Sequence, residues 1–169
     1  MITTKLYALL ITLCRIATGL AFGLLIVTVM TQVISRTFLT GSPVWTEELT
    51  RFALLFMAAF GAGLSFRNGE MVNVDMICEM LPAKFQRILL FVSASLTAVF
   101  CLMLVMPAWK FVSIGVMQTS PALGLRMDFV HVTVFILLVL LGLFAILRVV
   151  RMIAGASDGK PEGQSENLS

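Results

Sequence analysis

PVWTEELTRFALLFMAAFGAGLSFRNGEMVNVD, residues 43–75, is the stretch that decides the fold. Its apolar body, from about residue 49 to residue 66, is close to the ~20 residues that a helix needs to cross a bilayer. A charged side chain inside hydrocarbon is costly and usually has a partner. We therefore expect a spanning helix whose charged ends lie at the two membrane surfaces. Four residues crowd the start of this helix, Trp45, Glu47, Glu48 and Arg51, and three follow its apolar body, Arg67, Glu70 and Asp75.

The composition extends this interpretation to the whole chain. Of its 169 residues, 59% are hydrophobic and 12% are charged, whereas a soluble domain has about 25% charged residues. The fold class is therefore an all-α integral membrane protein. The net charge of +3 comes from basic residues that are scattered singly and form no stripe, so we expect no nucleic-acid partner.

Four apolar runs predict four transmembrane helices. We expect the first run to be an uncleaved transmembrane span and not a cleaved signal peptide, because Arg15 interrupts the segment that could serve as a signal peptide. Its helix would be about 50 Å long at 1.5 Å per residue, which exceeds a ~30 Å hydrocarbon core and requires tilt or projection. We expect residues 1–154 to form the membrane domain and residues 155–169 to form a disordered cytoplasmic tail. The predicted spans are about 6–39, 47–66, 88–118 and 128–150.

The second span has a predicted start and two distinct faces. Thr46 is the expected N-cap residue. Small residues at helical spacing, Ala58 and Ala62 among them, form a smooth face that suits close helix packing within the chain or with a partner. Phenylalanines at steps of four form another face, which we expect to meet lipid or the grooves of a partner. These are Phe52, Phe56 and Phe60.

A short amphipathic helix is predicted between the second and third spans, flat in the membrane interface. Its apolar positions repeat at helical spacing and lie opposite polar ones. The apolar set is Met71, Val74, Ile77, Cys78 and Leu81, and the polar set is Asn73, Asp75 and Glu79.

The distribution of basic residues predicts the orientation. With the N-terminus inside, eight Lys and Arg residues fall on the cytoplasmic side and four on the outer side, which favours cytoplasmic N- and C-termini. Trp45 and Trp109 then lie at the same outer interface.

The sequence offers little reactive chemistry. His131 follows Asp128 by three residues; a local hydrogen-bonded pair is the favoured interpretation and a proton relay the alternative. One histidine cannot hold haem or catalytic zinc, and the central parts of the spans carry no ionisable residue for a transport site. We predict no catalytic, cofactor-binding or metal-binding residues and no transport by this chain alone.

The charged ends leave two interpretations open. Glu47 and Glu48 can pair locally with Arg51 at spacings of four and three residues, or the three can dock another subunit. Arg67 and Asp75 can belong to a solvated loop or contact a partner. The candidate partner or lipid contacts are Trp45, Glu47, Glu48, Arg51, Ala58, Ala62, Arg67 and Asp75.

Several motifs together resemble a known family. They are Trp45-x-Glu47-Glu48-x-x-Arg51, Gly61-x-Gly63-x-x-x-Arg67-x-Gly69-Glu70, Val72-Asn73-Val74-Asp75 and Ser120-Pro121-Ala122-Leu123-Gly124-Leu125. In this order they resemble the small membrane subunit of tripartite ATP-independent periplasmic (TRAP) transporters, over roughly residues 10–150. The chain departs from the family after Leu125, where the family tends to have proline, methionine and tryptophan and this chain has Arg126, Met127 and Asp128.

The resemblance implies a function. In such transporters a large membrane subunit carries the substrate and sodium sites, a periplasmic binding protein delivers an organic acid, and the small subunit braces the large one in the bacterial inner membrane. The implied partners are these two proteins and membrane lipids, without a cofactor. Two alternatives remain open: a membrane anchor of a redox complex, and a small homo-oligomeric transporter.

Overall fold

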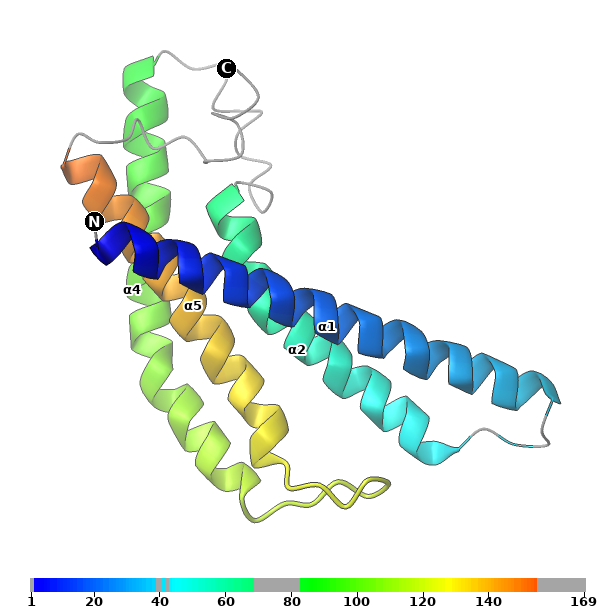
Figure 1. The fold of residues 1–169 in the computed structure, drawn as a ribbon. Helices are drawn as coiled ribbons and strands as arrows, with labels where there is room; N and C mark the ends of the chain where they lie inside the picture. Colours follow the sequence, from blue (N-terminus) through cyan, green and yellow to red (C-terminus); the bar gives the residue numbers. More distant parts are fainter. Residues whose placement is uncertain (1, 39–40, 42, 69–82, 155–169) are drawn as a thin grey trace. The chain divides into compact units, whose positions relative to one another are not determined.

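The structure is a computed structural model that describes residues 2–38, 41, 43–68 and 83–154. Four long helices account for most of these residues (Figure 1): α1 Ile2–Phe38, α2 Val44–Asn68, α4 Ala83–Gly115 and α5 Asp128–Ile153. All four are long and apolar enough to cross a membrane, which confirms the prediction of an all-α chain with four candidate spans. The predicted amphipathic helix and the predicted tail lie outside the described residues.

The start of α2 differs from the prediction. The helix begins at Val44, so Thr46 lies within its first turn. The Thr46 hydroxyl donates a hydrogen bond to the carbonyl oxygen of Pro43 at 2.7 Å, and its side chain is 0% exposed. A hydroxyl that is buried and turned back toward the preceding carbonyl does not cap the N–H groups ahead of it. The prediction that Thr46 is the N-cap residue is therefore wrong.

The described chain divides into two compact units. The first contains Met1–Gly61 and Ala108–Ile136, and the second contains Ala62–Pro107 and Leu137–Ser169. In the first unit α1 lies beside the first part of α2 (Figure 1), and a Cβ atom added at Gly61 would lie 3.7 Å from Thr18 Cγ2, an ordinary contact distance.

Small residues bring the helices of the second unit close together. A Cβ atom added at Gly63 of α2 would lie 3.1 to 3.2 Å from Leu140 and Phe144 of α5, and one added at Gly142 would lie 3.1 Å from Cys101 Cβ of α4. Backbones that approach this closely gain extensive van der Waals contact, which is the main attraction between helices in a membrane.

The smooth face of α2 is only partly used within the chain. Ala59 is 1% exposed and Gly63 is also buried, whereas Ala58 is exposed and Ala62 is half-buried. The close packing within the chain therefore involves Ala59 and Gly63, each one position after the predicted Ala58 and Ala62. A contact of Ala58 and Ala62 with a partner stays a prediction.

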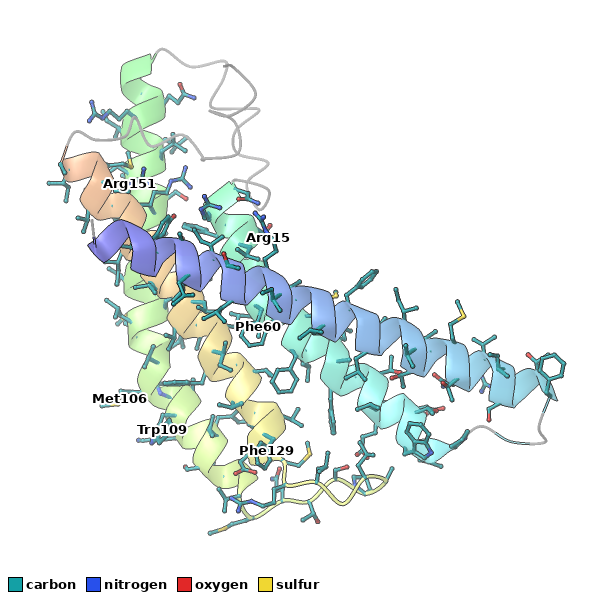
Figure 2. The ribbon with its side chains drawn as sticks, viewed as in Figure 1. Arg15, Phe60, Met106, Trp109, Phe129 and Arg151 are labelled. Atoms are coloured by element: carbon teal, nitrogen blue, oxygen red, sulfur yellow. The ribbon has the colours of Figure 1, made fainter. Side chains whose placement is uncertain are left out.

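Long apolar side chains cover the outer surfaces of the helices (Figure 2). Met106 projects from α4 and is 73% exposed. In water such exposure would be a liability, but it is the ordinary surface of a helix that meets lipid or another membrane subunit.

Candidate functional site

The first unit joins the start of α2 to the segment between α4 and α5 through the carboxylate of Glu48. Its Oε2 atom accepts hydrogen bonds from the backbone N–H of Ala122 at 3.1 Å and of Leu123 at 2.9 Å. Hydrogen bonds to a charged acceptor are roughly twice as strong as neutral ones. Two of the sequence motifs, 45–51 and 120–125, thus meet in one place, which we call the Glu48 junction.

The segment that Glu48 binds is itself held in a defined shape. Ser120 N–H donates to Leu125 O at 2.8 Å, and Gly124 N–H donates to Ser120 O at 3.0 Å. A short antiparallel bridge pairs Thr119 with Arg126. Gly124 has φ +64°, a backbone conformation that glycine adopts without the strain of a Cβ atom. The loop is therefore a closed hairpin that presents two adjacent N–H groups to one carboxylate.

The other predicted contact residues of this end are at the surface. Trp45 is 41% exposed, and Glu47 and Arg51 are also exposed on the same turns of α2. Of the two glutamates, Glu48 has its hydrogen-bond partners on another part of the chain. Glu47 and Arg51 are four residues apart and share one exposed face of α2. Trp45 is exposed on another face of the same first turns.

The predicted group at the other end of α2 is described in part. Arg67 is half-buried and engaged in contacts. Its neighbour Phe66 is buried, and the Arg148 guanidinium carbon lies 5.7 Å from the centre of the Phe66 ring, a cation–π distance. Asp75 lies outside the described residues.

His131 and Asp128 do not form the predicted local pair. Asp128 accepts a hydrogen bond from Arg126 at 2.8 Å, while His131 Nδ1 lies 3.2 Å from the carbonyl oxygen of Phe111. The imidazole also stacks on the Phe111 ring, with centroids 4.0 Å apart. The interpretation is wrong because the end of α4 offers the imidazole both a ring and a carbonyl, and the side chain turns to them.

The Glu48 junction thus joins α2 to the loop between α4 and α5. Across the described ranges, no three His, Cys, Asp or Glu residues gather as a metal site would require. The described cysteines, Cys14 and Cys101, are buried and unpaired by disulfide. The four helices that are long and apolar enough to cross a membrane indicate the class of multi-pass membrane proteins.

Comparison with known proteins gives the family. Residues 25–155 match the family described as "Tripartite ATP-independent periplasmic transporters, DctQ component". The chain belongs to this family, and the resemblance drawn from the motifs is confirmed. The matched range includes both segments that meet at the Glu48 junction.

Similar proteins agree with this assignment. A "Putative TRAP transporter small permease protein" from Haemophilus influenzae is 25% identical over 108 residues, 64% of this chain and 67% of that protein. A second protein of the same name and organism is 25% identical over 117 residues, 69% of this chain and 71% of that protein. The "Isethionate TRAP transporter permease protein DctMQ" from Oleidesulfovibrio alaskensis is 29% identical over 117 residues, 66% of this chain but 17% of that protein.

These findings establish a TRAP transporter small permease subunit with transmembrane helices. The family and the four apolar helices together indicate a multi-pass inner-membrane protein.

Proposed function

We propose that this chain is the non-catalytic small subunit of a sodium-driven TRAP transporter for an organic acid, and that it braces the large membrane subunit. The observation that carries the bracing role is the Glu48 junction, which ties two segments of the family motifs together with 2.9 and 3.1 Å hydrogen bonds. A brace needs its ends fixed and its helices closely packed, and the contacts of Gly63 and Gly142 supply such packing.

The large membrane subunit is the proposed main partner. A permease from Oleidesulfovibrio alaskensis holds a region similar to this chain within 17% of its length. A single polypeptide that joins such a region to a much longer one supports a lasting association of the two parts in this transporter too. The name of that relative includes isethionate, an organic anion, which supports an organic acid as the class of substrate here.

Open faces are available for the partners. A Cβ atom added at Gly19 or Gly23 would meet nothing within 4 Å, so this GxxxG pair is free to receive a helix from outside the chain. Ala58 offers a second small position on α2. We assign these faces to the large subunit and to lipid.

Three exposed residues at the start of α2 are assigned to contacts at the outer membrane surface: Trp45, Glu47 and Arg51. The termini are then cytoplasmic, as the excess of basic residues favours. The periplasmic binding protein would approach from the outer side. Arg67 and Asp75 are then assigned to the cytoplasmic edge.

Co-purification and uptake test the proposal. The tagged chain should isolate the large membrane subunit from membranes, and uptake of the organic acid should require both subunits, the binding protein and a sodium gradient. Absence of a stable complex, or uptake that is unchanged without this chain, would refute the bracing role. Uptake by this chain alone in proteoliposomes would favour a homo-oligomeric transporter instead, and a Soret band in the purified protein would favour a redox anchor.

A further inference from the structure

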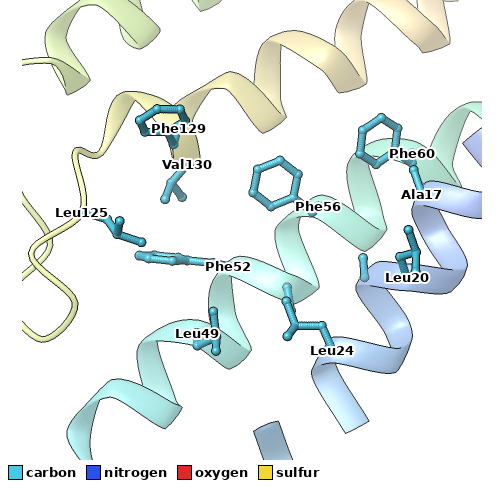
Figure 3. Close-up of a pocket in the computed structure, with 12 residues that line it drawn as sticks. Ala17, Leu20, Leu24, Leu49, Phe52, Phe56, Phe60, Leu125, Phe129 and Val130 are labelled. Atoms are coloured by element: carbon cyan, nitrogen blue, oxygen red, sulfur yellow. The ribbon is translucent and has the colours of Figure 1, made fainter. Parts of the chain in front are cut away.

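An apolar pocket of about 370 Å³ lies within the first unit. Figure 3 shows that its walls come from α1, from α2 and from the segment that enters α5. Each of its twelve lining residues is Ala, Leu, Phe or Val. The volume falls within the ~300–1,000 Å³ that is typical of small-molecule sites. The phenylalanine face of α2, at residues 52, 56 and 60, forms one long wall.

The pocket is elongated along α2. Its lining runs from Leu49 to Phe60, eleven residues apart on one helix, which corresponds to about 16 Å at 1.5 Å per residue. One leaflet of a bilayer has a hydrocarbon layer of about 15 Å, half of the ~30 Å core. Leu125 and Phe129 line the end of the pocket near the 118–127 hairpin, and Ala17 and Phe60 line the other end (Figure 3). The pocket therefore has the length of one leaflet and one end beside the ordered loop.

Neither water nor an empty space suits these walls. A buried water needs two to four polar partners, and the lining residues offer apolar side chains alone. An empty pocket would deprive those side chains of dispersion contacts on one side. In a membrane, the flexible hydrocarbon that reaches such a pocket is an acyl chain. A helix of the large subunit, which carries side chains on successive turns, is the competing occupant, and cross-linking from position 56 distinguishes the two.

We propose that this pocket holds one acyl chain of a phospholipid whose phosphate is bound by Arg126. The inference depends on the membrane location of the chain and not on the bracing role, so the two can fail separately.

Arg126 supplies the charge that a phosphate requires. It directly follows the lining residue Leu125, and its side chain is 54% exposed. One of its terminal nitrogens donates to Asp128 at 2.8 Å, and a guanidinium has five N–H donors. Its remaining donors can therefore bind a phosphate oxygen while the ion pair with Asp128 persists.

Photolabelling of the transporter in membranes tests the pocket. Vesicles of phosphatidylethanolamine and phosphatidylglycerol would contain a phospholipid with a diazirine near the end of one acyl chain. We expect label on peptides that contain Ala17 and Phe60, which line the end of the pocket away from the hairpin. That label should be lost in Ala17→Phe, because the larger side chain fills this end. Val27→Phe, on an exposed position of the same helix outside the pocket, is the matched control and should keep it. Equal labelling of wild type and Ala17→Phe would overturn the proposal.

A second measurement does not depend on the folding of Ala17→Phe. Benzoylphenylalanine at position 56 keeps an aromatic side chain in the pocket wall and forms a covalent adduct with whatever fills the pocket. A mass increase equal to a phospholipid supports the proposal, whereas a cross-link to the large subunit or another polypeptide overturns it.

The headgroup is tested separately. Wild type should label more strongly with the phospholipid than with a diacylglycerol that carries the same diazirine chain, and Arg126→Gln should lose that preference while Arg126→Lys keeps it. A preference that persists in Arg126→Gln would overturn the assignment of the phosphate to Arg126.

Discussion

Gly115, the last residue of α4, is a position where one methyl group should measurably destabilise the first unit. A Cβ atom there would lie 2.5 Å from His131 Nδ1 and 2.8 and 2.9 Å from the backbone N and Cα of Asp128. Ordinary contact begins at 3.4 Å, so the start of α5 would have to move by about half an ångström even if the His131 ring turned away. Because two of the three atoms belong to the backbone, a rotamer change cannot relieve the clash.

The expected cost of Gly115→Ala follows from this geometry. Overpacking of this kind costs about 1–3 kcal/mol, and Ala regains little helix propensity at a helix end. At roughly 2–4 °C per kcal/mol for a chain of this size, the Tm should fall by roughly 2–12 °C. The buried thiols of Cys14 and Cys101 report unfolding through a thiol-reactive dye, in a Cys78→Ser background.

The matched control is Gly23→Ala in the middle of α1, where an added Cβ atom meets nothing within 4 Å. There the gain in helix propensity, up to ~1 kcal/mol, should leave the Tm unchanged or raise it. A Tm for Gly115→Ala at or above that of wild type would show that the end of α4 and the start of α5 do not pack as described.

Three further changes test the Glu48 junction, the α2–α5 packing and the exposed Arg51. Glu48→Ala should speed hydrogen exchange at the N–H of Ala122, which loses its acceptor, more than at Leu123, which keeps a 3.3 Å bond to Ser120 Oγ; Glu47→Ala should not, and equal exchange in both variants would contradict the junction. In the chain without its partner, Gly63→Leu should lower the Tm, because overpacking costs about 1–3 kcal/mol of stability, whereas Gly19→Leu on an open face should not; equal Tm values would contradict the α2–α5 contact. Arg51→Glu should reduce the yield of large subunit in co-purification while Arg51→Lys preserves it, and an unaltered yield with Arg51→Glu would remove Arg51 from the docking surface.

The four spans could be predicted because hydrocarbon tolerates few alternatives. A chain that is 59% hydrophobic must satisfy its backbone groups within helices wherever it crosses a bilayer. The lengths of the apolar runs, and the Gly and Pro residues between them, then give the approximate bounds of the helices. Pro107, which lies inside α4, shows the limit of such punctuation, since membrane helices tolerate proline where soluble helices do not.

The hydrogen-bond partners of individual side chains could not be predicted from the sequence. The spacing within each helix predicted that Glu48 pairs with Arg51 and His131 with Asp128. Instead, Glu48 accepts hydrogen bonds from N–H groups 74 and 75 residues further along the chain. His131 turns to Phe111, 20 residues earlier. Such choices depend on which backbone groups the fold leaves without a partner nearby, and spacing within one helix carries no information about that.

The hairpin itself left a signal in the sequence. Ser120, Gly124 and the residues between them form a turn pattern, and Gly124 adopts the positive φ that such a turn needs. The sequence also offers a reason to expect that the hairpin contacts Glu48. Residues 45–51 and 120–125 are both among the motifs that resemble the family.

The separation of 74 residues between Glu48 and Ala122 has a consequence for biogenesis. At a synthesis rate of about 5–20 residues per second, Ala122 leaves the ribosome roughly 4–15 s after Glu48 does. Throughout that interval the carboxylate is without the N–H groups that bind it in the finished protein. The Glu48 junction therefore closes only after α4 has been synthesised, so it is among the later contacts to form in the first unit.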